Sequence, residues 1–171
     1  NHQSARLVDL PGAYSFEPLS PEEQVTLDVV TGKMPAHETP SALLFVTEPT
    51  SLPRTLPQLG ALLQLTDLPV VLVLTMLDEL KARGGQVHPF KLERDLGIPV
   101  VGVVGHRGLG LEDLRDILGS EDRLQRKKAR REPPLDPAER FTWADEVLSE
   151  SYQTPTRGTS LTDKLDKVLL H

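Results

Sequence analysis

The sequence contains no cysteine, few aromatic residues and no long apolar run, and each absence excludes a class of protein. Without cysteine the chain has neither disulfides nor thiolate metal sites, which fits a reducing compartment. Aromatic residues make up 4% of the chain, so we expect an aliphatic core. No apolar run approaches the roughly 20 residues of a transmembrane helix. A formal net charge of -6 argues against general binding to nucleic-acid phosphates.

The length and hydrophobic content suit one domain with an appendage. The chain has 171 residues, of which 38% are hydrophobic. Its first four residues have no signal-peptide character, and the first expected strand follows them almost at once. Because a natural chain rarely opens on an interior strand, we expect the sequence to be a fragment of a longer protein.

Four short apolar runs alternate with helical patterns along the first 120 residues. The runs lack a regular polar alternation, which is typical of strands buried on both faces of a parallel sheet. They predict strands at 6–9, 42–46, 69–74 and 99–104. Helices are predicted at 21–31, 52–66, 78–83, 91–96 and 111–118. This order predicts an α/β fold with a doubly wound, mostly parallel sheet.

The helix at 21–31 has the clearest start signal. Ser20 can cap the helix, Pro21 suits its first position, and Glu23 stands three residues after the cap. Together these residues form a capping box, which satisfies amides that a helix leaves open at its start.

A strongly basic run, residues 126–131, follows the sheet region. It has two interpretations. The run could contact anionic lipid headgroups, or it could be a solvated helix end and linker.

The last 50 residues predict a small helical unit, residues 121–171, beside a sheet domain of residues 1–120. A helix is expected at 141–152, and a further one begins near Ser160. The expected apolar face of the first helix comprises Phe141, Ala144, Val147 and Leu148. Because this unit has too little apolar surface to fold alone, we expect it to pack on the sheet domain.

The first expected strand ends in Asp9 and breaks at once on Pro11 and Gly12. Ligands bind at the carboxyl edge of such sheets. There Asp9 could hold a hydrated Mg²⁺, and the Gly12 amide could meet a terminal phosphate. A plain strand-to-turn junction would give the same pattern, since Pro and Gly are ordinary turn residues.

Two more strand ends carry specific residues. Asp78 follows the strand at 69–74, and a flexible loop, residues 104–110, follows the strand at 99–104. A carboxylate such as Asp78 can accept both the N1–H and the exocyclic amine of guanine, which distinguishes guanine from adenine. Asp78 could equally cap the helix that follows it.

The series of motifs resembles one known family over essentially the whole chain. The order is D-L-P-G-x-Y-S, S-P-E-E, E-P-T-S-L-P-R-T-L, T-M-L-D and then L-G-I-P-V-V-G-V-V-G-H-R-G-L-G-L-E-D-L. It resembles the GTPase domain of the ferrous-iron transport protein B (FeoB) family. The terminal T-D-K-L-D-K-V-L-L-H resembles the helical regulatory segment before that family's first membrane span.

The resemblance assigns roles to three groups of residues. It implies a phosphate- and Mg²⁺-sensing motif, with Mg²⁺ held by Asp9 through water, at Asp9, Leu10, Pro11, Gly12 and Ala13. It implies a second switch over residues 13–24. It implies a guanine-specificity motif at Thr75, Met76, Leu77 and Asp78, and a loop behind the base at Val104, Gly105 and His106.

The same resemblance implies a function and a location. The parent protein would bind and hydrolyse GTP on the cytoplasmic side of the bacterial inner membrane and couple nucleotide state to ferrous iron uptake. Its partners would be GTP or GDP with Mg²⁺ and its own C-terminal transmembrane domain, with oligomers possible through the membrane part. No nucleic-acid partner is expected.

This chain departs from the family pattern in ways that leave alternatives open. It lacks the phosphate-binding loop G-x-x-x-x-G-K-[ST] and the first switch, so the chain alone is expected to be inactive. Thr75 replaces the usual Asn, Val104 the usual Ser and Ala13 the usual Thr. The chain is therefore either a truncated GTPase, which we favour, or a module that has lost nucleotide binding and acts by packing on the membrane part.

Other readings have less support. A receiver-like domain would need a second acid beside Asp9 and a late lysine. The five histidines show no metal-ligand spacing, and no side chain presents itself as a catalytic base. The catalytic residues therefore stay unknown at this point.

Overall fold

The computed structural model describes residues 6–11, 20–33 and 40–155 of the chain. The predicted last helix, from Ser160, lies outside the described residues. The helices are α1 (Pro21–Val30), α2 (Leu52–Leu65), α3 (Leu77–Ala82), α4 (Pro89–Leu96), α5 (Leu111–Leu118), α6 (Glu121–Leu124) and α7 (Arg140–Ser151). The strands are β1 (Leu43–Thr47), β2 (Val70–Leu74), β3 (Gln86–Val87), β4 (Val100–Gly102) and β5 (Tyr152–Gln153). Short 3-10 turns occupy Pro49–Ser51, Gly105–Arg107 and Pro137–Glu139.

A three-stranded parallel sheet, in the order β1-β2-β4, forms the centre of the fold. It confirms the α/β class and the parallel sheet. The central strand β2 is buried along its whole length. On the edge strand β1 the prediction of burial on both faces was wrong, because Val46 leaves 58% of its surface exposed.

The predicted strand at 6–9 was wrong. Residues 6–9 form no strand, and Leu7 and Val8 are 79% and 61% exposed. An extended segment satisfies its amides and buries its side chains only beside another strand. In the described part of the chain the outer side of β1 carries no partner strand, and residues 6–9 do not fill that place.

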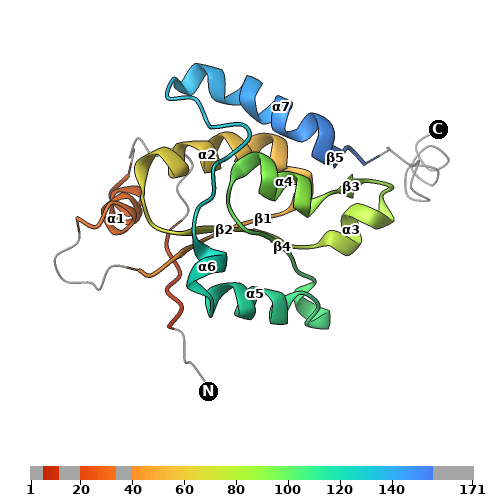
Figure 1. Ribbon diagram of the computed structural model, residues 1–171, viewed down its shortest axis with the longest axis horizontal. Coiled ribbons are helices and arrows are strands. Elements are labelled where there is room, and N and C mark those ends of the chain that lie inside the picture. The colour runs from red at the N-terminus through yellow and green to blue at the C-terminus, as the bar shows by residue number, and fades with distance from the viewer. Residues whose placement is uncertain (1–5, 12–19, 34–39, 156–171) are drawn as a thin grey trace, which may run out of the picture.

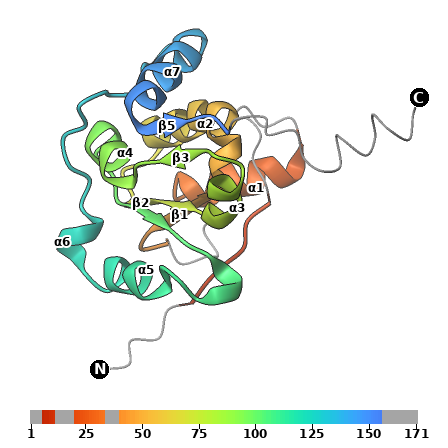
Figure 2. The same cartoon turned by 90° about the vertical axis from the view of Figure 1, so that its right-hand side faces the viewer.

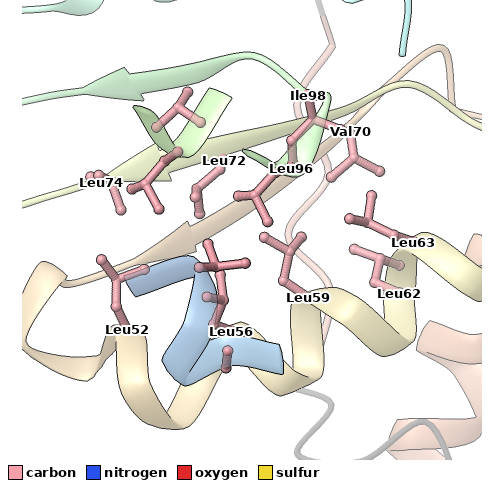
Figure 3. Close-up of a cluster of buried hydrophobic side chains, with 14 of the residues drawn as sticks. Leu52, Leu56, Leu59, Leu62, Leu63, Val70, Leu72, Leu74, Leu96 and Ile98 are labelled. Atoms are coloured by element: carbon pink, nitrogen blue, oxygen red, sulfur yellow. The ribbon is translucent and has the colours of Figure 1, made fainter. Parts of the chain in front are cut away.

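Helices cover the sheet unequally on its two faces (Figure 1). Alternate residues of each strand point to opposite faces, so Leu72 and Leu74 face α2 while Val71 and Val73 face α5. The α2 face holds the larger core, in which leucines from α2 pack against the strands and α4 (Figure 3). Its labelled side chains are Leu52, Leu56, Leu59, Leu62, Leu63, Val70, Leu72, Leu74, Leu96 and Ile98.

The capping box of α1 is borne out at its first contact. The Ser20 hydroxyl accepts a hydrogen bond from the Glu23 amide at 3.2 Å, and Pro21 opens the helix. Helix α4 ends on Gly97, which has the left-handed conformation (φ 69°). Start and stop residues therefore specify these helices locally.

Helix α7 packs on α2 and α4, as expected for a unit too small to fold alone. Trp143, Ala144, Val147 and Leu148 join the larger core. The predicted place of Phe141 on this face was wrong, since it is 62% exposed and Trp143 is buried instead. The Trp143 indole donates to the carbonyl of Arg131 at 2.9 Å and lies against Gly60 of α2.

The basic run at 126–131 has no regular secondary structure and lies along the end of α4, with most of its side chains exposed and its backbone engaged. Its backbone amides satisfy carbonyls that the helix end leaves open. The three donors are Lys127, Arg130 and Arg131, and the acceptors are Gly97, Arg94 and Asp95, at 2.8, 3.2 and 3.0 Å. The backbone and the arginines of the run are engaged within the fold, and the side chains of Lys127 and Lys128 are exposed, so contact with lipid headgroups stays a prediction.

A buried carboxylate organises the charges around this run. Asp95 has no exposed side-chain surface, and its Oδ1 accepts from Arg94 Nε at 3.0 Å. Arg130 and Arg131 approach the same carboxylate at 3.6 and 3.7 Å. Both of these arginines also pair with Glu150 of α7, at 3.1 and 3.4 Å. The cluster joins α4, the basic run and α7.

A second, two-stranded sheet pairs β3 with β5 in antiparallel fashion and was not predicted. It joins the segment after α3 to the end of α7 (Figure 2). Two residues per strand give no readable alternation, so the sequence carried no signal for it. Among the described helices none has the length and apolar character needed to cross a membrane.

Candidate functional site

The carboxyl edge of the main sheet begins with a threonine cluster at the ends of β1 and β2. The amide and hydroxyl of Thr75 both donate to the carbonyl of Thr47, at 3.0 and 3.4 Å. The Thr47 and Thr55 hydroxyls lie 3.1 Å apart. Thr75 is thus held by β1, and its side chain is turned toward the backbone of the neighbouring strand. Sequence reasoning missed Thr47, although a polar residue directly after a buried run was the available signal.

Residues 76 and 77 set the direction in which the backbone enters α3. Met76 is the one non-glycine residue with positive φ (55°) in the described chain, a conformation that costs roughly 1–2 kcal/mol. Leu77 then packs directly on Gly102 of β4, where a Cβ would collide with its methyl group. Backbone strain of this kind persists where surrounding contacts over-determine it. The contacts of Leu77 do so here and place Asp78 in the first turn of α3.

The loop after β4 is anchored beside Asp78. The Val103 amide donates to the carbonyl of Leu74 at 2.7 Å, so pairing continues up to the loop. Val104 and Leu109 form a backbone bridge across its base. A Cβ at Gly110 would collide with the carbonyl of Gly102, so glycine is required for this close approach.

The two loops bring together Asp78 and His106. The nearest atoms, Asp78 Oδ2 and His106 Nε2, lie 3.8 Å apart. The Asp78 side chain is 34% exposed and that of His106 is 67% exposed. Asp78 therefore presents a partly open carboxylate at the positive end of a short helix. Such a group can accept two adjacent N–H donors from a flat ligand edge.

The Asp9 segment stands apart from these loops. Asp9 and Pro11 are exposed and Leu10 is partly buried. Among the described residues, α1 supplies a hydrogen bond to this segment, in which the Thr26 hydroxyl donates to the carbonyl of Pro11 at 2.8 Å. Gly12 and Ala13, and most of the predicted second switch, lie outside the described residues.

Of the predicted site residues, the structure thus brings together those at 75–78 and 104–106. Val104 is buried at the base of its loop, and Gly105 and His106 are exposed at its tip. No described feature places Asp9 against them. The functional assignment of every one of these residues stays a prediction.

Metal ligation by the described residues is limited. In residues 6–11, 20–33 and 40–155 no group of three or more histidine, aspartate or glutamate side chains gathers in a way that could hold a metal ion. Asp9 is a single exposed carboxylate. It fits a magnesium ion that keeps most of its water, and it does not fit an ion held by a protein cage.

Comparison with known proteins gives a consistent result. The family model of "Ferrous iron transport protein B" matches residues 1–118. The chain is 39% identical over 113 residues to the "Fe(2+) transport protein A/Fe(2+) transporter FeoB fusion protein" of Porphyromonas gingivalis. That match covers 66% of this chain and 13% of the relative. It is 33% identical over 117 residues to the "Fe(2+) transporter FeoB" of Leptospira interrogans, covering 68% of this chain and 16% of the relative.

Solved structures agree with the fold. The cytosolic domain of L. pneumophila FeoB matches with a TM-score of 0.69 at 21% identity, covering 85% of this chain and 77% of that one. A point mutant of S. thermophilus NFeoB bound to GDP matches with a TM-score of 0.56 at 32% identity, covering 63% and 40%. The present chain spans 13% and 16% of the two transporters compared above. On the match to residues 1–118, the chain belongs to the ferrous iron transport protein B family.

Proposed function

We propose that this chain is the guanine-nucleotide-binding part of a GTP-hydrolysing ferrous iron transporter. The observation that carries the proposal is the Asp78 carboxylate, which stands at the carboxyl edge of the sheet between two anchored loops. Family membership supports it, because a relative at 32% identity was solved with GDP.

Asp78 would read the base. A carboxylate there accepts the N1–H and the exocyclic amine of guanine, and adenine offers no such pair of donors. The Val104 to His106 loop would back the ring from the neighbouring strand. Thr75, turned toward Thr47, would support this loop through the backbone and not through the base.

The phosphate end would depend on Asp9 and the Gly12 amide, together with a phosphate-binding loop that this sequence does not contain. Magnesium would supply charge neutralisation at the phosphates, and Asp9 would hold it through water. Catalysis would rest on positioning and on stabilising developing charge. Among the described residues we assign no side chain as a catalytic base.

In the whole protein this module would act beside a transmembrane domain, on its cytoplasmic side, and nucleotide state would influence iron uptake. Residues 121–171 would be the helical regulatory segment between the two, with the sheet domain ending near residue 120. Helix α7 packs in the main core, which supports a firm mechanical connection between the regulatory segment and the sheet domain.

A second candidate is a packing module that no longer binds nucleotide. The exposed course of residues 6–11 and the engagement of the Thr75 hydroxyl with the backbone favour it. The two candidates differ in one property, which is selective binding of guanine.

Titration with a fluorescent GDP analogue and Mg²⁺ distinguishes them. The chain is compared with a longer form that carries a G-x-x-x-x-G-K-[ST] loop ahead of Asn1. We expect binding by the longer form, with guanine preferred over adenine and with Asp78→Ala abolishing that preference. The matched control is Asp113→Ala, which removes an exposed carboxylate from the first turn of α5 and should change nothing. A longer form that stays silent at millimolar nucleotide would establish the packing module instead.

A further inference from the structure

The short strand β5 pairs with β3, which follows the helix that carries Asp78 in the sequence. Residues 152–153 pair with residues 86–87, which follow α3 after a two-glycine turn (Figure 2). The His88 amide extends the pairing by donating to the carbonyl of Ser151 at 2.8 Å. Backbone pairing between β5 and β3 therefore links the end of α7 to the segment that follows α3, the helix that carries Asp78.

Gly85 lies close to both α3 and β5. A Cβ at this position would lie 2.5 Å from Leu80 Cδ1 and 3.2 Å from the carbonyl oxygen of Gln153. The Gly85 amide also donates to the carbonyl of Leu80 at 2.9 Å. Leu80 itself is 1% exposed. A side chain at Gly85 would therefore collide with Leu80 and press on the β5 backbone.

Helix α3 needs such support. It spans six residues, which is too short for a helix to persist on its own hydrogen bonds. Its entry through Met76 is in an unfavourable backbone conformation. Leu77 packs on Gly102 at one end of the helix, Leu80 lies against the Gly85 turn at the other, and the helix also contacts the turn at Pro49–Ser51.

The other side of the connection is rigid. Helix α7 is fixed in the main core by Val147 and Leu148, and Ser151 is fully buried. Lys91 of α4 donates to the carbonyl of Glu150 at 3.0 Å, close to the start of β5. Strand β5 is therefore held in place by α7 and α4, and it pairs with β3, the strand that follows α3.

We propose that β5 is a positioning element for Asp78. Its pairing with β3 holds α3 in place, so that separating residues 152–153 from β3 would release the Asp78 carboxylate from the orientation that reads guanine. This inference rests on the proposed role of Asp78. The influence of β5 on base selectivity would pass through β3 and α3.

Hydrogen exchange in the full chain tests the connection without nucleotide. Gln153→Pro places proline inside the β5 ladder, where it cannot donate and is poorly accommodated. The readout is exchange of the Glu79 and Leu80 amides, which donate to the carbonyl of Met76 at 3.1 and 3.3 Å. We expect it to accelerate by about ten-fold, the equivalent of one or two lost hydrogen bonds.

The matched control places proline one residue later. Thr154→Pro lies just past β5 and should leave both amides as they are. The Leu72 amide, which bonds Pro99 across the main sheet, should be unchanged in both variants. If the His88 amide loses protection in Gln153→Pro while Glu79 and Leu80 keep theirs, β5 does not position α3 and the proposal is overturned.

A second variant guards against general unfolding. Gly85→Ala adds a methyl group against Leu80 and the Gln153 carbonyl, and unlike Gln153→Pro it removes no backbone donor from the strands. It should also accelerate Glu79 and Leu80 exchange. Equal acceleration of the Leu72 amide in both variants would mean that the effect is global, and it would likewise reject a positioning role.

The functional readout is base selectivity, which a merely stabilising role would not move. In the longer form described above, Gln153→Pro should lower the guanine-over-adenine ratio by about ten-fold, and Thr154→Pro should not. An unchanged ratio in a form that does prefer guanine would refute the proposal. A longer form that binds no nucleotide would reject the proposed function, and the exchange result would still decide whether β5 positions Asp78.

Discussion

The two parts of the candidate nucleotide site are held in different ways. Residues 75–78 and 104–106 continue directly from paired strands and are fixed by packing between Leu77 and Gly102. Residues 6–11 lie largely exposed, and within the described part of the chain the side-chain hydrogen bond that reaches them comes from Thr26. A motif thus places its side chains only where pairing and packing fix the backbone beneath them.

The largest effect on stability should come from the core beneath residues 75–78 and 104–106, which form the anchored part of the candidate site. Leu74 is fully buried and immediately precedes Thr75, so Leu74→Ala should lower the free energy of unfolding by about 2–5 kcal/mol. Val8→Ala, in the exposed segment, should change it by less than about 0.5 kcal/mol. Urea denaturation followed by circular dichroism measures both. Similar losses for the two variants would show that residues 6–9 are packed after all.

A pair of glycines sharpens the comparison inside the anchored part. Gly102→Ala would push Leu77 off β4 and should cost about 1–3 kcal/mol. Gly105→Ala meets open space and should stay within about 0.5 kcal/mol of the parent chain. The same denaturation experiment applies. A neutral Gly102→Ala would mean that Leu77 does not fix the approach to Asp78.

The exposed segment can be released selectively. Thr26→Val removes the donor to Pro11 and should cost about 0.5–1.5 kcal/mol. It should also speed tryptic cleavage after Arg6. Thr31→Val is the matched control, because its hydroxyl bonds Leu27 within the same helix. Cleavage that is equally fast in both variants would count against a role for Thr26 in holding this segment.

The smallest effect concerns charge at the α7 end. The Arg130 guanidinium, hydrogen-bonded to Glu150, lowers the pKa of that carboxyl, and nearby Arg94 and Arg131 add to this. A lowered pKa in the folded state contributes stability above the unfolded value, and this is lost as pH falls through the folded value. Glu150→Gln should therefore lower the melting temperature slightly at pH 7 and have no effect near pH 2. Glu112→Gln in α5 serves as the exposed control, and a Glu150 effect that grows toward acid would contradict the assignment.

Local signals predicted much of the fold. The apolar run at 69–74 predicted the central strand, and the Ser20 signal predicted the start of α1, because each depends on residues close in sequence. The predicted class and family were confirmed for the same reason, since they rest on runs and motifs readable in order.

The errors came from contacts distant in sequence. Residues 6–9 have the composition of a strand, but burial requires a neighbour that the described chain does not supply. Phe141 and Trp143 are two positions apart on one helix, and the choice between them depends on where Gly60 leaves room.

The basic run at 126–131 is largely exposed, but the role of its backbone amides, which satisfy carbonyls at the end of α4, carries no sequence signal. In the candidate site, Asp78 could be predicted by its place after a buried run. Its proximity to His106 depends on the pairing of β2 with β4, which spacing alone does not show.

Trp143 gives the molecule an optical property of its own. It is the one tryptophan in the chain, and it is clamped between Gly60 of α2 and the carbonyl of Arg131. Its emission should be blue-shifted while α7 is docked and should move to the red when α7 leaves the sheet domain. The unlabelled protein therefore carries a native fluorophore that reports, in real time, whether its carboxyl-terminal helix is seated.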